Sequence, residues 1–475
     1  MLALVNTNTM QPPVAPIGLD YIAGAARAAD IDVEIIDLCL SENPSEELAN
    51  RLSANQPELV APSFRNIDDC FWPSAQWFVP KLCDWVSQIR GVSDAPIVLG
   101  GVGFSIMPER IVDYTGADFG IRGDGEQAIV ELVGQLRGAG RWQLVPGLIW
   151  RDDGKIHSNK PAWPQKISLL TSRDYVDNKT YFEKGGQCGL ETKRGCNRMC
   201  VYCADPLAKG RHLRVRDAVE VADEAANLLE QGIDMLHLCD SEFNIPSEHA
   251  KEICREFIRR GLGEKIHWYT YMAVTPFDDE LAGLMKKAGC VGIDFTADAA
   301  SGIMLSNYRD VHRAADLSAA VKLCRDNGIT VMLDLLLGGP GETPQTLAET
   351  IEFVRKTGPD CVGASLGVRI YPNTQMAAVV ETEEELETNP NIKRKYEGPV
   401  DFFKPTFYIS HLLGPEPARL VRNLIGADKR FFKPMLEADD SQSTDHNYND
   451  NTALCEAIAA GARGAYWDIL RKMRE

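Results

Sequence analysis

The stretch Glu191-Thr-Lys-Arg-Gly-Cys-Asn-Arg-Met-Cys-Val-Tyr-Cys203 holds three cysteines at C-x-x-x-C-x-x-C spacing. Thiolates are soft ligands that bind iron–sulfur clusters. A cubane held by Cys196, Cys200 and Cys203 would leave one iron open to a small molecule, as catalytic zinc sites leave one position open. The alternatives are a zinc site or three unrelated buried thiols. Zinc sites prefer paired C-x-x-C units, and the sequence contains no second pair. The stretch therefore predicts a [4Fe–4S] site.

Composition narrows the class of protein. The 475 residues include 13 cysteines, an odd and scattered set that indicates reduced thiols in a reducing cytoplasm. The net charge of −18 repels phosphate backbones, so we expect no nucleic-acid partner. No apolar run is long enough for a membrane span, and the N-terminus lacks the basic region of a signal peptide.

Basic side chains gather around the cysteine loop despite the acidic total. They are Lys193, Arg194, Arg198, Lys209, Arg211, Arg214 and Arg216. They either balance the charges of a cluster and a bound anionic group or contact nucleic acid, and we favour the first interpretation.

Residues 1–140 alternate short apolar runs with helical patterns, which predicts a Rossmann-like, doubly wound parallel sheet in an α/β domain. The expected strands are Leu2–Val5, Val33–Ile36, Leu59–Pro62, Ile97–Leu99 and Asp118–Ile121. Ligands of such sheets bind beyond the carboxyl ends of the strands. Two of the loops there are glycine-rich, which lets the backbone approach a ligand closely. Their candidate cofactor-binding residues are Gly100, Gly101, Gly103, Gly123, Gly125 and Glu126.

The rest of the chain divides into three parts. Residues 141–187 are expected to be a connector with a hairpin over 148–157, turning at Asp-Gly. Residues 188–374 return to strand–helix alternation in six units, which predicts a partial (β/α)6 TIM-type barrel with its active site at the carboxyl ends of the strands. Residues 375–475 are expected to form a mainly helical C-terminal region that caps the barrel.

The cysteine loop resembles that of the radical S-adenosylmethionine (SAM) superfamily, in which the open iron chelates the methionine part of SAM. Later stretches follow in the order of that family, ending with Gly338-Gly-Pro-Gly-Glu-Thr343, whose Thr343 can cap the next helix. The resemblance implies that Tyr202 lies near the adenine and that Asp240 or Glu242 holds the amino group. It further implies that Asp298 holds the ribose, that Gly338 and Gly339 pass close to SAM, and that the backbone at Arg369 contacts the adenine.

The first 140 residues resemble the cobalamin-binding domain that often precedes a radical SAM barrel. The segments that carry this resemblance are Leu99–Gly103 and Arg122–Glu126. Many such domains carry D-x-H-x-x-G, whose histidine binds cobalt from below. These 140 residues contain no histidine, so this domain offers no such ligand. The alternative is a Rossmann-like domain that has lost its cofactor.

Arg65 and Tyr308 are the candidate catalytic residues. The stretch around Arg65 resembles a subgroup that includes the cobalamin-dependent tryptophan methylase, in which an arginine lies below cobalt without binding it. The alternative role for Arg65 is a salt bridge to Asp68 or Asp69. Tyr308 is a candidate base near the ribose loop, or a side chain held in place by Arg309.

The resemblance implies a cytoplasmic, cobalamin-dependent radical SAM methyltransferase that uses a [4Fe–4S] cluster, SAM and cobalamin. One SAM would methylate cobalt, while a second usually yields a radical, a step that the tryptophan methylase omits. The substrate would be an unactivated carbon, or phosphorus, of a small molecule or natural-product precursor. Electrons would come from a donor such as flavodoxin or ferredoxin. The alternatives are 3-amino-3-carboxypropyl transfer, ring formation, oxidation, or a binding module without turnover. RNA methylthiolation is disfavoured, because Cys39, Cys70 and Cys83 do not form that family's second cluster motif.

Overall fold

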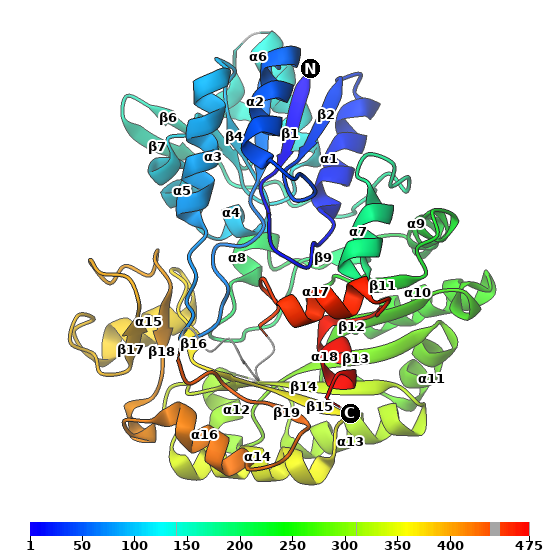
Figure 1. Ribbon diagram of the computed structural model, residues 1–475, viewed down its shortest axis with the longest axis vertical. Helices are drawn as coiled ribbons and strands as arrows, with labels where there is room; N and C mark the ends of the chain where they lie inside the picture. Colours follow the sequence, from blue (N-terminus) through cyan, green and yellow to red (C-terminus); the bar gives the residue numbers. More distant parts are fainter. Residues whose placement is uncertain (139, 310, 438–446, 475) are drawn as a thin grey trace.

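The computed structural model describes residues 1–138, 140–309, 311–437 and 447–474. Figure 1 shows the N-terminal domain, blue to cyan, stacked over a second sheet, green to yellow. The carboxyl ends of the strands in both sheets are followed by loops that meet between the two domains.

The N-terminal sheet is parallel over its first five strands. Strands β1 (Leu2–Asn6), β2 (Val33–Asp37) and β3 (Leu59–Ser63) pair in the order β2-β1-β3, while β4 (Val98–Leu99) pairs with β5 (Phe119–Ile121). Parallel bridges between Val60 and Ile97 and between Ser63 and Gly100 join β3 to β4. The helices are α1 (Ile17–Ala28), α2 (Pro44–Asn55), α3 (Val79–Val92), α4 (Val102–Ile106), α5 (Pro108–Thr115) and α6 (Glu126–Arg137). The predicted doubly wound sheet is confirmed.

The hairpin of the connector belongs to this sheet. Strands β6 (Leu148–Asp152) and β7 (Lys155–Ser158) pair antiparallel to β5 in the order β5-β6-β7, after the short helix η1 (Trp142–Leu144). Asp153 and Gly154 turn the hairpin with φ of 45° and 76°, the geometry that an Asp-Gly turn favours. The hairpin prediction is confirmed, but the first domain extends past the boundary expected at residue 140.

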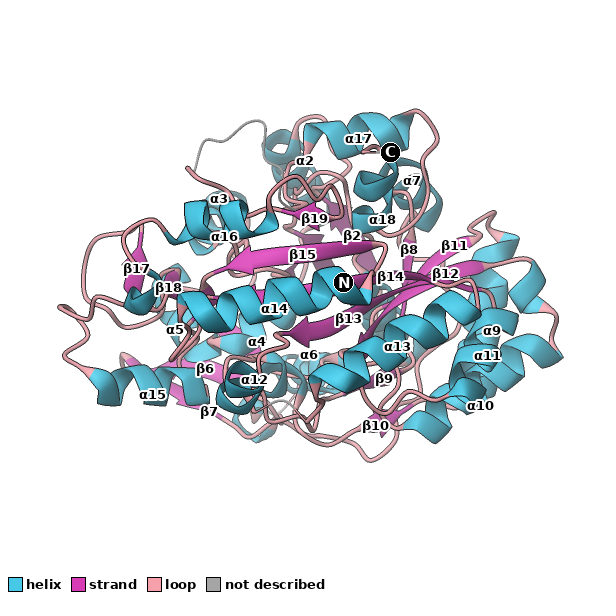
Figure 2. Ribbon diagram, turned by 90° about the horizontal axis from the view of Figure 1, so that it is seen from below, coloured by secondary structure: helices cyan, strands magenta, loops and turns pink. Residues whose placement is uncertain are grey.

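The second sheet is all parallel and contains the six expected barrel strands. They are β8 (Cys188–Leu190), β11 (Met235–Leu238), β12 (His267–Ala273), β13 (Cys290–Asp298), β14 (Thr330–Leu337) and β15 (Cys361–Leu366). Their outer face is covered by α9 (Ala218–Glu230), α10 (Ser247–Arg259), α11 (Asp279–Lys287), α13 (Ala314–Asp326) and α14 (Pro344–Thr357), and Figure 2 looks from below onto α13 and α14. Thr343 caps α14 as predicted, because its hydroxyl accepts a hydrogen bond from the amide of Thr346 (3.3 Å).

Shorter elements complete the barrel and its connections. They are α7 (Asn178–Gly185), β9 (Lys193–Arg194), α8 (Asp205–Lys209), β10 (Arg214–Val215), η2 (Leu262–Glu264) and α12 (Gly302–Tyr308). β9 and β10 pair antiparallel on either side of the cysteine loop, so the loop leaves and returns at one place.

The C-terminal region is mainly helical, as expected, and it also contains short strands. It contains α15 (Gln375–Glu383), η3 (His411–Leu413), α16 (Pro417–Ile425), α17 (Thr452–Ala459) and α18 (Tyr466–Lys472), together with β17 (Ile392–Arg394), β18 (Thr406–Tyr408) and β19 (Phe431–Phe432). β19 adds a seventh parallel strand beside β15, and β17 and β18 form a small antiparallel sheet with β16 (Val368–Arg369). Trp467 of α18 packs against Tyr269 (ring centroids 5.6 Å apart) and closes the amino end of the barrel.

Two buried arginines fix the domains relative to each other. Arg173 is fully buried and pairs with Asp20 of the first domain (2.7 Å) and Glu224 of the barrel (2.9 Å). Arg369 pairs with Asp68 (2.8 Å) across the other side of the domain contact. Removing one partner of a buried pair typically costs about 3–5 kcal/mol, so these pairs hold the strand-end loops in a set arrangement. Within the described ranges, every helix is too short or too polar to cross a membrane.

Candidate functional site

The cysteine loop is positioned by its own backbone. Gly195 has a φ of 89°, and a side chain there would meet the carbonyl of His212, so the entry to the loop requires glycine. The amide of Cys196 donates to the carbonyl of Gly210 (3.1 Å), and the amide of Val201 donates to the carbonyl of Tyr308 (3.2 Å). These bonds hold the loop between α8 and α12.

The three cysteines line one cavity of about 190 Å³. Tyr202, Glu242 and Asp298 line the same cavity, as the sequence predicted for a shared site. Arg198, one of the basic residues expected around the cysteine loop, lines it too, whereas sequence reasoning missed Asp205, Ser241, Thr296 and His312. Only Thr296 carried a usable signal, because it lies two residues before Asp298 near the end of a barrel strand.

The arrangement of the cysteines suits a cluster better than a single ion. Among the described residues, no three His, Cys, Asp or Glu side chains converge as ligands of one metal ion. In a cubane each cysteine binds its own iron at a separate corner, so the sulfurs surround the cluster without meeting at a point.

Asp240 and Glu242 lie two residues apart but have opposite environments. Asp240 is buried and already accepts hydrogen bonds from the amides of Thr192 (2.8 Å) and Lys193 (3.2 Å). Its carboxylate braces the start of the cysteine loop, which favours the alternative, Glu242, as the residue that holds the amino group of SAM.

Glu242 has the properties that Asp240 lacks. One carboxylate oxygen accepts from the hydroxyl of Thr296 (3.0 Å), while the other is buried without a hydrogen-bond partner among the described residues. Burial raises the pKa of Glu242 to about 7, although Thr296 and Lys193 oppose the rise. An unused acceptor on the cavity wall fits a positively charged donor group such as the amino group of SAM.

Tyr202 and Asp298 act together. The hydroxyl of Tyr202 donates to the carboxylate of Asp298 (2.6 Å), and Asp298 adopts a left-handed φ of 52° at the end of β13. The two side chains therefore form one polar wall of the cavity, consistent with the roles expected near the adenine and the ribose.

Tyr308 does not face the cavity. It is fully buried, and its hydroxyl donates to the backbone carbonyl of Leu336 (2.7 Å). Its ring meets that of Tyr202 edge-on (centroids 5.8 Å apart). The hydroxyl of Tyr308 is thus committed to a backbone acceptor, which favours a supporting role beside Tyr202; its role as a catalytic base stays a prediction.

The glycine-rich loop after β14 is built around Tyr308 and Glu342. A side chain at Gly339 would overlap the hydroxyl of Tyr308, and Gly338 has a φ of 91°. The amide of Gly338 donates to Glu342, whose pKa burial raises to about 7. Neither glycine lines the cysteine cavity, so the loop shapes the site through packing and not through a direct lining contact.

Arg369 holds the domains together with its side chain. Besides the ion pair with Asp68, it donates to the carbonyl of Phe402 (3.2 Å) and lies over the ring of Tyr371 (4.4 Å). It does not line the cysteine cavity, so its side chain is not free for a cofactor.

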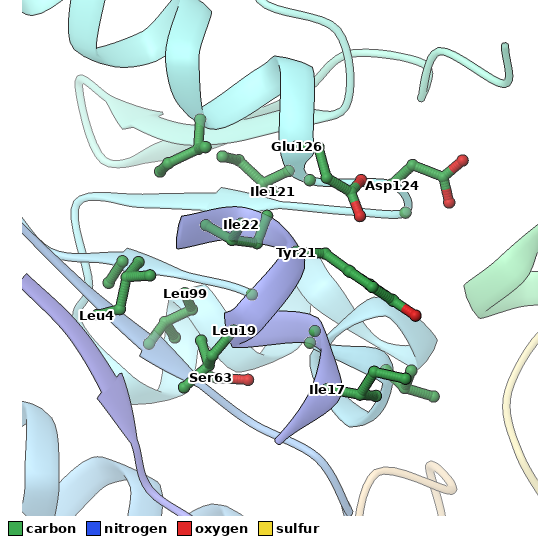
Figure 3. Close-up of a pocket in the computed structure, with 18 of the residues that line it drawn as sticks. Leu4, Ile17, Leu19, Tyr21, Ile22, Ser63, Leu99, Ile121, Asp124 and Glu126 are labelled. Carbon is green, nitrogen blue, oxygen red and sulfur yellow. The ribbon is translucent and has the colours of Figure 1, made fainter. Parts of the chain in front are cut away.

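A second cavity, of about 210 Å³, opens at the carboxyl ends of the N-terminal strands (Figure 3). Its floor is apolar, with Leu4, Leu99 and Ile121 labelled in the figure, and Tyr21 and Glu126 reach its polar side. The glycines predicted to bind a cofactor that line it are Gly100, Gly101, Gly123 and Gly125. Arg194 of the barrel lines the cavity too and pairs with Glu126 (2.7 Å). Burial raises the pKa of Glu126, but Arg194 outweighs it, so the net pKa is lowered.

The glycines allow the loops to approach each other. Gly101 has a φ of 104°, and a side chain on Gly103 would lie 2.8 Å from the carbonyl oxygen of Arg65. Gly103 does not line the cavity but lets α4 lie directly against the loop that carries Arg65. The cavity thus combines an apolar floor with backbone-lined walls, which fits a flat, apolar part of a larger ligand such as cobalamin.

Arg65 is exposed on the loop after β3. In the part of the chain that the structure describes, the hydrogen-bonding partner of its guanidinium is the adjacent Asn66 (3.4 Å). Asp68 is paired with Arg369, and Asp69 accepts from Ser74 and from the amide of Gln76 (3.0 Å). The alternative salt bridge of Arg65 to Asp68 or Asp69 is therefore not formed.

Comparison with known proteins finds two family matches, one over each of the parts of the chain that hold these cavities. The model of the Radical SAM superfamily matches residues 190–354, and the model of the B12 binding domain matches residues 3–133. Tryptophan 2-C-methyltransferase of Streptomyces laurentii is 28% identical, over 98% of this chain and 95% of that protein.

Solved structures extend the match to the whole fold. TsrM from Kitasatospora setae, a radical SAM methyltransferase with tryptophan and a SAM analogue bound, superposes with a TM-score of 0.92 at 29% identity, over 99% of this chain and 97% of that one. A second structure of TsrM, with cobalamin and a [4Fe–4S] cluster bound, gives a TM-score of 0.89 at 28% identity, over the same shares of both chains. The chain thus contains a radical SAM domain, preceded by a B12-binding domain.

Proposed function

We propose that the protein is a cobalamin-dependent radical SAM methyltransferase that methylates an unactivated carbon of a small molecule. The observation that carries this proposal is that one short helix, α8, lines both cavities: Ala208 and Lys209 line the N-terminal cavity, and Asp205 and Pro206 line the cysteine cavity. The charge of Arg65, in the first domain, also acts on the barrel: burial raises the pKa of Cys239 to about 12, and Arg65 counteracts the rise. The methyltransferases among the relatives, which act on tryptophan, a hopanoid and a phosphonate, support the reaction class.

Each cofactor has residues that fit it. Cys196, Cys200 and Cys203 would hold the cluster, Glu242 and Asp298 would bind SAM, and the cavity of Figure 3 would hold cobalamin. When bound, cobalamin supplies a methyl carrier, and the cluster passes electrons from a donor such as flavodoxin or ferredoxin. The chain itself orients the ligands and excludes water from the space between its domains.

The test is anaerobic incubation of the reconstituted protein with SAM, cobalamin, a reductant and tryptophan, followed by mass spectrometry. Tryptophan is the first substrate to try, because two similar proteins are described with it. S-adenosylhomocysteine, formed only when cobalamin is present, supports the proposal. Methylthioadenosine would indicate aminocarboxypropyl transfer, and 5′-deoxyadenosine alone would indicate ring formation or oxidation.

A further inference from the structure

Asp294 is a buried carboxylate without a partner. It is 3% exposed, and it forms neither a hydrogen bond nor an ion pair within the described part of the chain. Transferring an ionised carboxylate out of water is costly unless a counter-charge or donor compensates. A protein retains such a group where a ligand supplies the missing partner.

The position of Asp294 lies on the inner face of the barrel. Side chains alternate along a strand, so Gly292, Asp294 and Thr296 of β13 point the same way. A side chain at Gly292 would meet Trp467, which closes the barrel floor, whereas Thr296 lines the cysteine cavity. Asp294 therefore lies one layer below the SAM-binding wall and one layer above the floor.

The neighbouring strands place an aromatic and an acidic side chain next to Asp294. Tyr271 of β12 is the register partner of Asp294, and Asp334 of β14 is the register partner of Thr296, one layer above. Although it lies inside the barrel, Tyr271 is 38% exposed, so open space adjoins its ring. An apolar, flat group can therefore lie against Tyr271.

The charges around Asp294 are acidic. Burial raises the pKa of Asp294, and the carboxylates of Asp334 and Glu242 raise it further. His237 packs against Tyr271 (ring centroids 4.8 Å apart), but burial lowers its pKa to about 4, so the imidazole is neutral. Tyr448 faces this layer from the C-terminal region, and its pKa is raised first by burial and then by Tyr271 and Asp294. Among the described residues, the charged groups that act on Asp294 are the carboxylates of Asp334 and Glu242, whereas the charge of Arg65 acts on the adjacent Tyr271.

We propose that Asp294, with Asp334 beside it, receives the protonated amine of the substrate while the substrate's flat apolar part lies along Tyr271. An ammonium group would give Asp294 its missing charge-assisted hydrogen bond and separate the two carboxylates electrostatically. A metal ion is the competing occupant, but the described residues form no three-ligand metal group. This inference rests on the proposed function and adds the substrate class, an arylalkyl amine.

The test is isothermal titration of the anaerobic, reconstituted holoenzyme with tryptamine, L-tryptophan and indole-3-propionate, the last of which lacks the amine. We expect the two amines to bind and indole-3-propionate to bind at least tenfold more weakly. Asp294→Asn should weaken amine binding by roughly 10–150-fold, the range of a hydrogen bond to a charged group. Asp153→Asn, the same change at an exposed hairpin turn, should bind as the wild type does.

Three results would overturn the inference: amines that bind no better than indole-3-propionate, amines that do not bind at all, or an Asp294→Asn variant with unchanged affinity. Titration with Mg²⁺ and Mn²⁺ alone tests the competing occupant, and metal binding lost in Asp294→Asn would also overturn it. Formation of S-adenosylhomocysteine without added amine separates the two proposals. Its absence in the wild type would contradict the proposed function, whereas its formation by a wild type that binds the amines no better than indole-3-propionate would contradict the inference alone.

Discussion

The loops at the carboxyl ends of the N-terminal strands (the N-terminal edge) and those at the carboxyl ends of the barrel strands (the barrel edge) differ in polarity and in how their acidic side chains are paired. The N-terminal edge is apolar and glycine-lined, and its acids are paired: Glu126 with Arg194 (2.7 Å), and Asp124 with Arg214 (3.1 Å). The barrel edge instead keeps buried carboxylate oxygens unpaired, at Glu242 and Asp294. The first edge selects a ligand by shape and close backbone approach, and the second by charge.

The largest expected effect is on the barrel edge. Replacing Cys196, Cys200 and Cys203 together by Ala should remove about four irons per chain and the brown chromophore. A control with Cys83→Ala and Cys455→Ala, two partly exposed thiols elsewhere, should retain both. Iron analysis and visible absorption check this prediction. A triple variant that keeps its iron would show that these three cysteines do not hold the cluster.

The next test compares Glu242 with Asp240. Glu242→Gln removes the charge of an unpaired acceptor, so we expect SAM affinity to fall about 10–150-fold with little change in Tm. Asp240→Asn removes the charge of a buried carboxylate that is bonded to Thr192 and paired with Lys193. We therefore expect a lower Tm and a loss of about 3–5 kcal/mol in the free energy of unfolding. Calorimetric titration with SAM and thermal unfolding measure both. Equal effects of the two variants on SAM affinity would show that the carboxylates share the ligand.

Arg65 tests how the N-terminal edge acts on cobalamin. Its guanidinium stays protonated and has no lone pair for a metal, so it would place a fixed charge near the ligand without binding cobalt. Arg65→Gln should change the absorption spectrum of bound cobalamin and slow S-adenosylhomocysteine formation roughly tenfold, or about 1.4 kcal/mol. Arg65→Lys, which keeps the charge, should lie between the two. An unchanged spectrum with weaker cobalamin binding would instead make Arg65 a structural residue of its loop.

A smaller effect should appear in the pH dependence of stability. Because burial raises the pKa of Asp294 in the folded state above its unfolded value, the folded protein binds the proton more tightly. Stability contributed by this group is therefore lost as pH rises above the unfolded pKa of about 4. Asp294→Asn removes that loss, so its Tm should match the wild type near about pH 4 and exceed it by roughly 1–3 °C near about pH 8. A Tm difference that is the same at both pH values would show that Asp294 does not titrate in this range.

The smallest effect is expected at Tyr308. A general base contributes about 10²–10⁴-fold to a rate, whereas a buried hydroxyl bonded to a backbone carbonyl contributes about 1 kcal/mol to stability. Tyr308→Phe should therefore keep the methylation rate within about twofold of the wild type and lower the Tm slightly. A rate loss of about 100-fold at unchanged KM would instead show that Tyr308 acts as a base.

Local pattern was enough to predict most of the fold. The six barrel strands and the five parallel strands of the first domain were predictable because each is a short, largely apolar run bounded by turn residues. The two-residue strand β19 was not, because Phe431 and Phe432 form a strand only when β15 supplies the hydrogen bonds. The same holds for the attachment of the hairpin to β5: its Asp-Gly turn is local, but its pairing partner is not.

The sequence by itself determined the cofactor chemistry, because the cysteine spacing and the glycine positions are local requirements of a cluster loop and of close backbone approach. Only the tertiary structure decided which acids are available. Asp240, Glu242 and Asp294 occupy strand-end or inner-face positions, and Tyr308 ends helix α12. Hydrogen bonds from residues distant in the sequence satisfy Asp240 (from Thr192) and Tyr308 (to Leu336), and leave an oxygen unused on Glu242 and Asp294. The availability of a buried polar group depends on partners that the chain brings together only on folding.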